Sequence, residues 1–111
     1  MNKYAALSLV SEAMLLGKRV VVITDHRPQV TRKALRILAD VAETSSWPGT
    51  RVEQYNHGGR IVIGGGSILV AGAKSTFRGM TADVVFIDNT TIDIGEVSPM
   101  LASSGGDLVY S

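Results

Sequence analysis

The most distinctive candidate for chemistry is an aspartate that ends a run of apolar residues. Asp88 follows Val84-Val85-Phe86-Ile87, and Asn89 comes directly after it. A carboxylate at the end of a buried strand can bind magnesium, but a single carboxylate without a phosphate partner is a poor site. An amide in the next position cannot act as a general base. The alternative to a metal ligand is that Asp88 only caps a helix or bonds to a loop, and we therefore expect no metal site.

Basic residues cluster in the first half of a predicted helix. Arg32 and Arg36 are four residues apart and share one face, and Lys33 lies beside them. This group could contact nucleic-acid phosphates together with Lys18, Arg19 and Arg27. The alternative is the solvated face of an amphipathic helix. Only Trp47 and Tyr55 are candidates for base stacking, so single-strand recognition has weak support from the sequence.

Two other features have simpler interpretations. Gly64-Gly65-Gly66 precedes a predicted strand and no Lys-Ser/Thr pair follows it, so it predicts a hairpin turn and not a phosphate loop. His26 follows the first predicted strand, at the end where α/β proteins bind ligands, but the sequence offers it no partner. With His57 as the second histidine, no metal cluster is expected.

The composition limits the class of protein. The chain has 111 residues, 45% of them hydrophobic and 19% charged, which suits one domain with one core. The net charge of +1 provides no overall basic field, so a nucleic-acid surface would have to be local. The absence of cysteine excludes disulfides and thiolate ligands. No apolar run approaches the roughly 20 residues of a membrane span, so we expect a cytoplasmic protein without a membrane partner.

The order of the predicted elements indicates an α/β fold for the single domain 1–111. Helical patterns cover residues 3–16 and 28–43, and a short helix is expected at 94–101. Continuous apolar runs predict buried strands, and glycine-containing turns separate three shorter strands. The strands are expected at residues 20–23, 52–55, 60–63, 68–71, 84–87 and 108–110. We expect a small, mostly parallel sheet with flanking helices and a β-hairpin insert.

Several stretches resemble the ATPase core of phage large terminase subunits and related helicase-like ATPases. Residues 73–88, a small-residue loop, an Arg-Gly pair and a strand ending in an acid, resemble a Walker B region. Residues 15–24 look like the end of the helix after a P-loop and the next strand. Residues 56–62 resemble the hairpin before Walker B, and 105–111 the strand leading to the coupling motif. The resemblance implies a truncated RecA-like P-loop NTPase core of bacteriophage origin, acting in the host cytoplasm.

The chain departs from this family where catalysis takes place. No glycine-rich Walker A loop is present; Lys3 stands near its lysine position, but Tyr4 replaces the hydroxyl residue. Asn89 stands where the family has the glutamate that polarises water. The resemblance thus implies a pseudo-ATPase with a vestigial Walker B in Asp88 and Asn89. It also implies that Lys3 and Arg78 contact a nucleotide or a neighbouring subunit, against the alternative of a solvated loop arginine at position 78.

Our first hypothesis is a non-catalytic terminase-like protein that binds DNA or a motor component. One alternative is a structural or self-associating interaction module without a nucleic-acid role, with a second copy or a phage or host protein as its partner. Another is a residual nucleotide-binding protein. We expect no cofactor in the first two cases.

Overall fold

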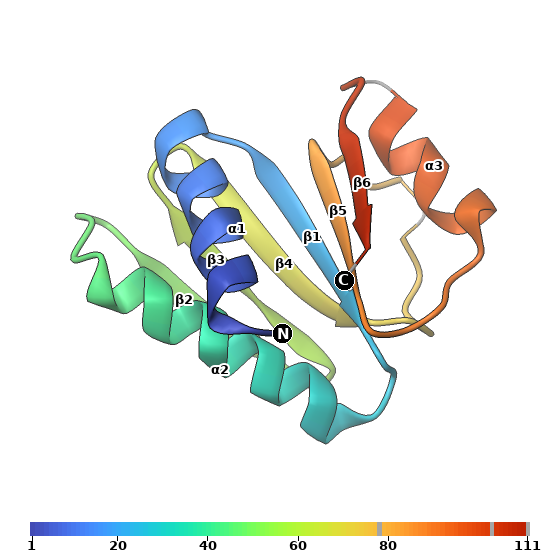
Figure 1. Ribbon diagram of the computed structural model, residues 1–111, viewed down its shortest axis with the longest axis horizontal. Helices are drawn as coiled ribbons and strands as arrows, with labels where there is room; N and C mark the ends of the chain where they lie inside the picture. The colour runs from blue at the N-terminus through green and yellow to red at the C-terminus, as the bar shows by residue number, and fades with distance from the viewer. Residues whose placement is uncertain (78, 103, 111) are drawn as a thin grey trace.

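The protein forms one six-stranded sheet with helices on both faces (Figure 1). The structure is a computed structural model that describes residues 1–77, 79–102 and 104–110. The elements, in chain order, are α1 (Lys3–Leu16), β1 (Arg19–Thr24), α2 (Pro28–Thr44), β2 (Arg51–Tyr55), β3 (Gly58–Ile63), β4 (Gly66–Gly72), β5 (Val84–Asp88), α3 (Ile94–Ala102) and β6 (Asp107–Tyr110).

The sheet is parallel at one end and antiparallel at the other. Its strand order is β2-β3-β4-β1-β5-β6. β1 pairs in parallel with β4 and β5, and β5 pairs in parallel with β6. Tight turns connect β2 to β3 and β3 to β4, so these neighbours are antiparallel. The β3–β4 turn needs glycine at Gly64, whose φ is 58° and where an added Cβ would lie 2.5 Å from the Met14 carbonyl oxygen.

Two apolar cores lie on opposite faces of the sheet. On one face, α1 and α2 pack on alternate strand residues that include Val20 and Val22 of β1. On the other face, α3 and the chain around Phe77 pack on the residues between them, Val21 and Ile23. Because β1 is covered on both faces, its sequence is continuously apolar.

α1 begins and ends as the sequence predicts, but it is apolar on most of its circumference. The Asn2 side chain accepts a hydrogen bond from the Ala5 amide at 2.8 Å, and Gly17 ends the helix in the left-handed conformation with φ 65°. The buried residues are Ala6, Leu9, Val10 and Ala13. Tyr4, which lies on the outer side, is 84% exposed.

The prediction of an α/β fold is confirmed, and each predicted helix and strand is present close to its expected bounds. The glycine run 64–66 forms the expected turn between β3 and β4. The predicted hairpin is part of the main sheet and makes one end of it antiparallel, so the sheet as a whole is mixed. None of the helices in the described ranges has the length and apolar character needed to cross a bilayer.

Candidate functional site

The carboxyl ends of β1 and β5 lie side by side at one edge of the sheet. The strands pair in parallel, and Thr24 at the end of β1 lies opposite Asp88 at the end of β5. The chain leaves β1 into α2 on one face, and it leaves β5 into α3 on the other. Ligands of α/β proteins bind at such a topological switch point, where connections from adjacent strands diverge. This edge is therefore the first candidate for a site.

Hydrogen bonds fix the loop that follows β1. The fully buried Thr24 hydroxyl lies 2.8 Å from the Thr31 hydroxyl of α2. Asp25 Oδ1 accepts bonds from the Arg27 backbone amide and from Arg27 Nε, both at 2.9 Å. These bonds, the backbone one first, lower the pKa of the Asp25 carboxyl below its ordinary value. The loop thus presents an aspartate and an arginine whose charges largely compensate each other.

Asp88 lies almost buried at the end of β5, with 5% of its surface exposed. Its Oδ2 lies 2.9 Å from the amino group of Met1, so the amino end of α1 is held against the end of β5. Asn89 follows in the left-handed region with φ 49°, which is uncommon for a residue with a side chain. Its amide cannot take up a proton from water.

A hollow of about 420 Å³ brings two of the predicted groups together. Asp88 and Asn89 line it together with Arg27 and Lys33 of the basic cluster. The remaining lining residues are Met1, Asp25, Gln29, Val30, Ala34 and Ile37. We call this the switch-point hollow. It contains both carboxylates and cations, so it is polar without a single dominant charge.

The first half of α2 carries a group of exposed cations. Arg32, Lys33 and Arg36 are all exposed. Within the described part of the chain, no carboxylate lies within ion-pair distance of any of them. The first turn of α2 also contains no acidic residue. Arg32 and Arg36 lie four residues apart on the helix, so the repulsion between their like charges costs the isolated protein some stability.

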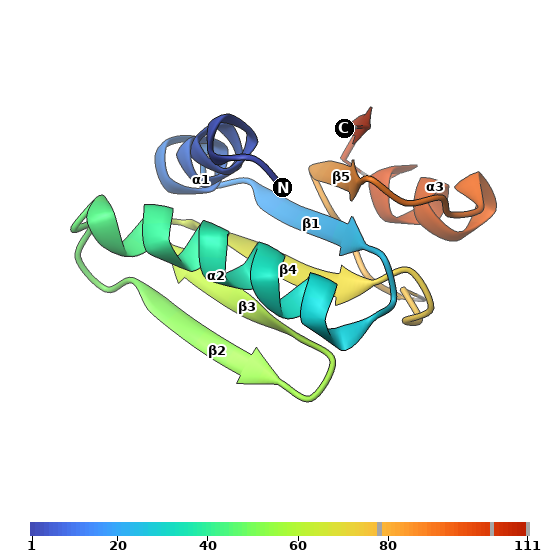
Figure 2. The ribbon, with the colours of Figure 1, turned by 60° about the horizontal axis from the view of Figure 1, so that its bottom comes forward.

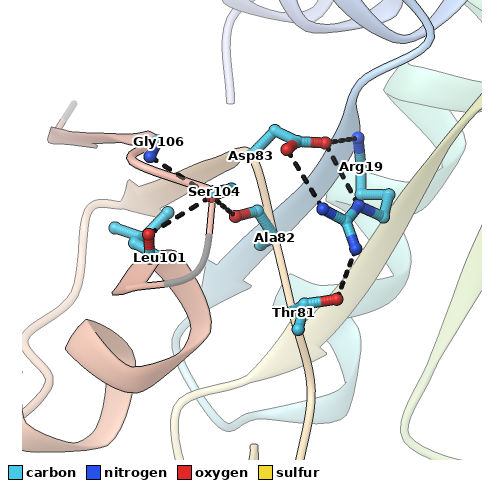
Figure 3. Close-up of polar contacts among 7 residues, drawn as sticks. All are labelled: Arg19, Thr81, Ala82, Asp83, Leu101, Ser104 and Gly106. Carbon is cyan, nitrogen blue, oxygen red and sulfur yellow. Dashed lines mark hydrogen bonds and ion pairs between the residues drawn. The ribbon is translucent and has the colours of Figure 1, made fainter.

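Lys18 and Arg19 lie at the opposite edge of the sheet and are paired. Lys18 Nζ lies 3.4 Å from Glu12 Oε1. Figure 3 shows Arg19 against Asp83, which accepts bonds from the Arg19 backbone amide at 2.8 Å and from its guanidinium at 3.2 Å. These bonds lower the pKa of the Asp83 carboxyl and raise that of Arg19. Six strand residues, roughly 20 Å, separate this edge from Arg27, so the six predicted cations do not form one surface.

The other predicted residues lie apart from the hollow. Lys3 is exposed and lines a groove of about 520 Å³ between α1 and α2. Arg78 lies outside the described residues. His26 Nδ1 is 3.8 Å from Asp25 Oδ1, and His26 lines a second hollow of about 280 Å³ with His57 and Lys74. No group of three metal-ligating side chains occurs among residues 1–77, 79–102 and 104–110.

Sequence reasoning missed two sets of residues with functional interest. It missed Asp83 as the partner of Arg19, because 64 positions separate them. It also missed that Arg51 and Tyr55 of β2 share a sheet face with Arg60 of β3. Side chains alternate between the two faces of a strand, and this alternation could have revealed the second set.

Comparisons of the chain with protein families, with curated proteins and with solved structures found no match.

Proposed function

We propose that the protein is a non-catalytic, RecA-like relative of phage packaging ATPases that binds DNA through α2. The observation that carries this proposal is the set of exposed cations Arg32, Lys33 and Arg36 without carboxylate partners in the described chain. A phosphate backbone supplies the negative charge that this part of the helix lacks. Arg27 lies at the start of the same helix, but Asp25 compensates its charge, so the proposed surface consists of the three cations that follow it.

Two further observations support the relation to packaging ATPases. The amino end of α1 contacts Asp88, which is the arrangement expected if α1 follows a degenerate P-loop and Asp88 is a vestigial Walker B acid. Asn89 supplies no base beside it. A phosphoryl-transfer site needs phosphate binding, a metal and an oriented water together, so this chain is proposed to lack turnover.

The test is the salt dependence of duplex DNA binding, measured by fluorescence anisotropy. Replacing both arginines in R32Q/R36Q should weaken binding on the order of 10-fold and reduce the log–log salt slope by about 1.8, since each phosphate contact contributes about 0.9. The matched control is K3Q/K74Q, which removes the same charge from two exposed lysines outside α2. Equal effects of both variants, or no effect of R32Q/R36Q, would refute DNA contact by α2.

A second candidate function, self-association, is favoured by the outer side of α1. Tyr4 is 84% exposed, Leu15 63% and Leu16 65%, although helices that are apolar on most sides are normally buried. If copies associate through this helix, Leu15→Glu should abolish the association. Sedimentation velocity over a range of concentrations distinguishes the cases, and a monomer at every concentration rejects this candidate.

A further inference from the structure

The face of the sheet opposite α1 and α2 is only half covered. Figure 2 shows α3 beside β5, at the far end of the sheet from β2. Its buried residues Val97 and Met100 belong to the core that contains Val85 and Ile87 of β5. No described helix packs on the antiparallel strands β2, β3 and β4 from this side.

Strand alternation determines which side chains lie on this uncovered area. In the antiparallel register Arg51 lies opposite Val62, and Glu53 lies opposite Arg60, which in turn lies opposite Leu69. The intervening residues of β3 and β4, such as Ile61 and Ile68, belong to the core under α1 and α2. We call the uncovered area the open sheet face, defined by Arg51, Glu53, Tyr55, Arg60, Val62 and Leu69.

The open sheet face combines an apolar floor with cations and one aromatic ring. Val62 is half-buried, Leu69 packs against the second core at the border of this face, and Tyr55 is 49% exposed. Tyr55, Arg60 and Leu69 line one hollow of about 310 Å³, which Arg19 also borders. The face therefore offers stacking surface and guanidinium groups within the same area.

The charges on this face favour an anionic partner. Glu53 is already engaged, because it accepts a bond from the Tyr55 hydroxyl at 3.2 Å and lies 4.0 Å from Arg51. Within the ranges that the structure describes, no carboxylate lies within ion-pair distance of Arg60. Arginines outnumber carboxylates, so a partner that carries negative charge complements the face.

We propose that the open sheet face binds single-stranded nucleic acid, with a base stacked on Tyr55 and phosphates near Arg60 and Arg51. Single strands present unstacked bases together with phosphates, and proteins bind them by aromatic stacking beside cationic groups. Duplex DNA keeps its bases stacked inside and could use only the arginines. This surface lies on the opposite face of the sheet from α2, so the inference stands or falls independently of DNA binding by α2.

The test uses anisotropy of a labelled oligothymidylate of about 20 nucleotides, a length that spans the site sizes of single-strand binding proteins. Tyr55→Ala should weaken binding about 10-fold, whereas Tyr55→Phe keeps the ring and should bind as the native chain does. R51Q/R60Q should reduce the salt slope by about 1.4, because each single-strand phosphate contact contributes about 0.7. Melting curves confirm that each variant is folded.

Measurements in the R32Q/R36Q variant test single-strand binding by the open sheet face separately from duplex binding by α2. In that background Tyr55→Ala should still weaken oligothymidylate binding by the same factor, and it should leave duplex binding unchanged in the native background. Absence of oligothymidylate binding at low salt overturns the inference, as does binding that is insensitive to Tyr55→Ala. If polyglutamate competes as well as the oligonucleotide and Tyr55→Ala has no effect, the face binds acidic protein segments instead.

Discussion

The cations at the two edges of the sheet have different surroundings. At the edge where β1 begins, Lys18 contacts Glu12, and Arg19 is bound by Asp83 through its backbone and its side chain. Near the other edge, Arg32 and Arg36 of α2 are exposed and have no carboxylate within ion-pair distance in the described chain. Burial alone does not separate these sets, because Arg19 is also largely exposed. The difference lies in the carboxylate partner. A cation bound by a carboxylate stabilises the fold, whereas a cation without one is available to a ligand.

The largest expected effect is on stability, from a change at the sheet edge where Arg19 is paired with Asp83. Asp83→Ala removes the acceptor of three bonds from Arg19. It should lower the free energy of unfolding by about 1 kcal/mol, because charge-assisted bonds contribute more than neutral ones but solvent screens this exposed pair. Urea denaturation measures the change. DNA binding should be unaffected, and a comparable loss of binding would show that the two edges are not functionally distinct.

The second largest expected effect is a loss of stability in acid, where Asp83 becomes protonated. The pKa of Asp83 is lowered in the folded chain by its bonds to Arg19, so its contribution to stability is complete above the unfolded-state pKa of about 3.9. That contribution is lost as the pH falls through the lower folded-state pKa. Thermal melts from neutral to acid pH should show a smaller acid loss for Asp83→Asn than for the native chain. Parallel curves for the two proteins would contradict this assignment.

Replacing the exposed arginines of α2 should change the stability in the opposite direction. R32Q/R36Q removes a like-charge pair four residues apart and reduces positive charge in the first half of α2. It should raise the free energy of unfolding by about 0.2–0.5 kcal/mol at low salt. The gain should disappear in high salt because exposed charges are screened. A loss of stability would mean that these arginines have a structural role after all.

The smallest expected effect concerns nucleotides at the switch-point hollow. ATP with magnesium should leave the melting temperature unchanged, because Asn89 supplies no carboxylate and no group of three metal-ligating side chains occurs among the described residues. A ligand present at about 100 times its Kd would add about 2.7 kcal/mol, which a melt detects easily. Such a shift would favour the nucleotide-binding alternative over the DNA-binding proposal.

Local sequence patterns were sufficient to predict the secondary structure. The apolar run of β1 and β5 reflects strands covered on both faces, and Gly17, Pro28 and Gly64 mark helix and turn boundaries. The pairing of charges could not be predicted in the same way. Arg19 and Asp83 meet only because β1 and β5 are neighbours, and sequence alone does not give that order.

The open sheet face shows a different limit. The alternation of Arg51, Glu53 and Tyr55 was visible in the sequence. Its importance depends on which strands α3 covers, and that depends on the placement of β5 and β6 at the other end of the sheet. The prediction that single-strand recognition had weak support rested on the number of aromatic residues. It did not consider where Tyr55 lies.

The central position of β1 has a consequence for synthesis on the ribosome. Both neighbours of β1 come later in the chain, β4 at Gly66–Gly72 and β5 at Val84–Asp88. The apolar residues of α1 and β1 therefore leave the ribosome well before the strands that cover them. Contacts of such long sequence separation make folding slow, because a long loop must close before they form. Chaperones that hold nascent chains would find their binding site in the first 24 residues.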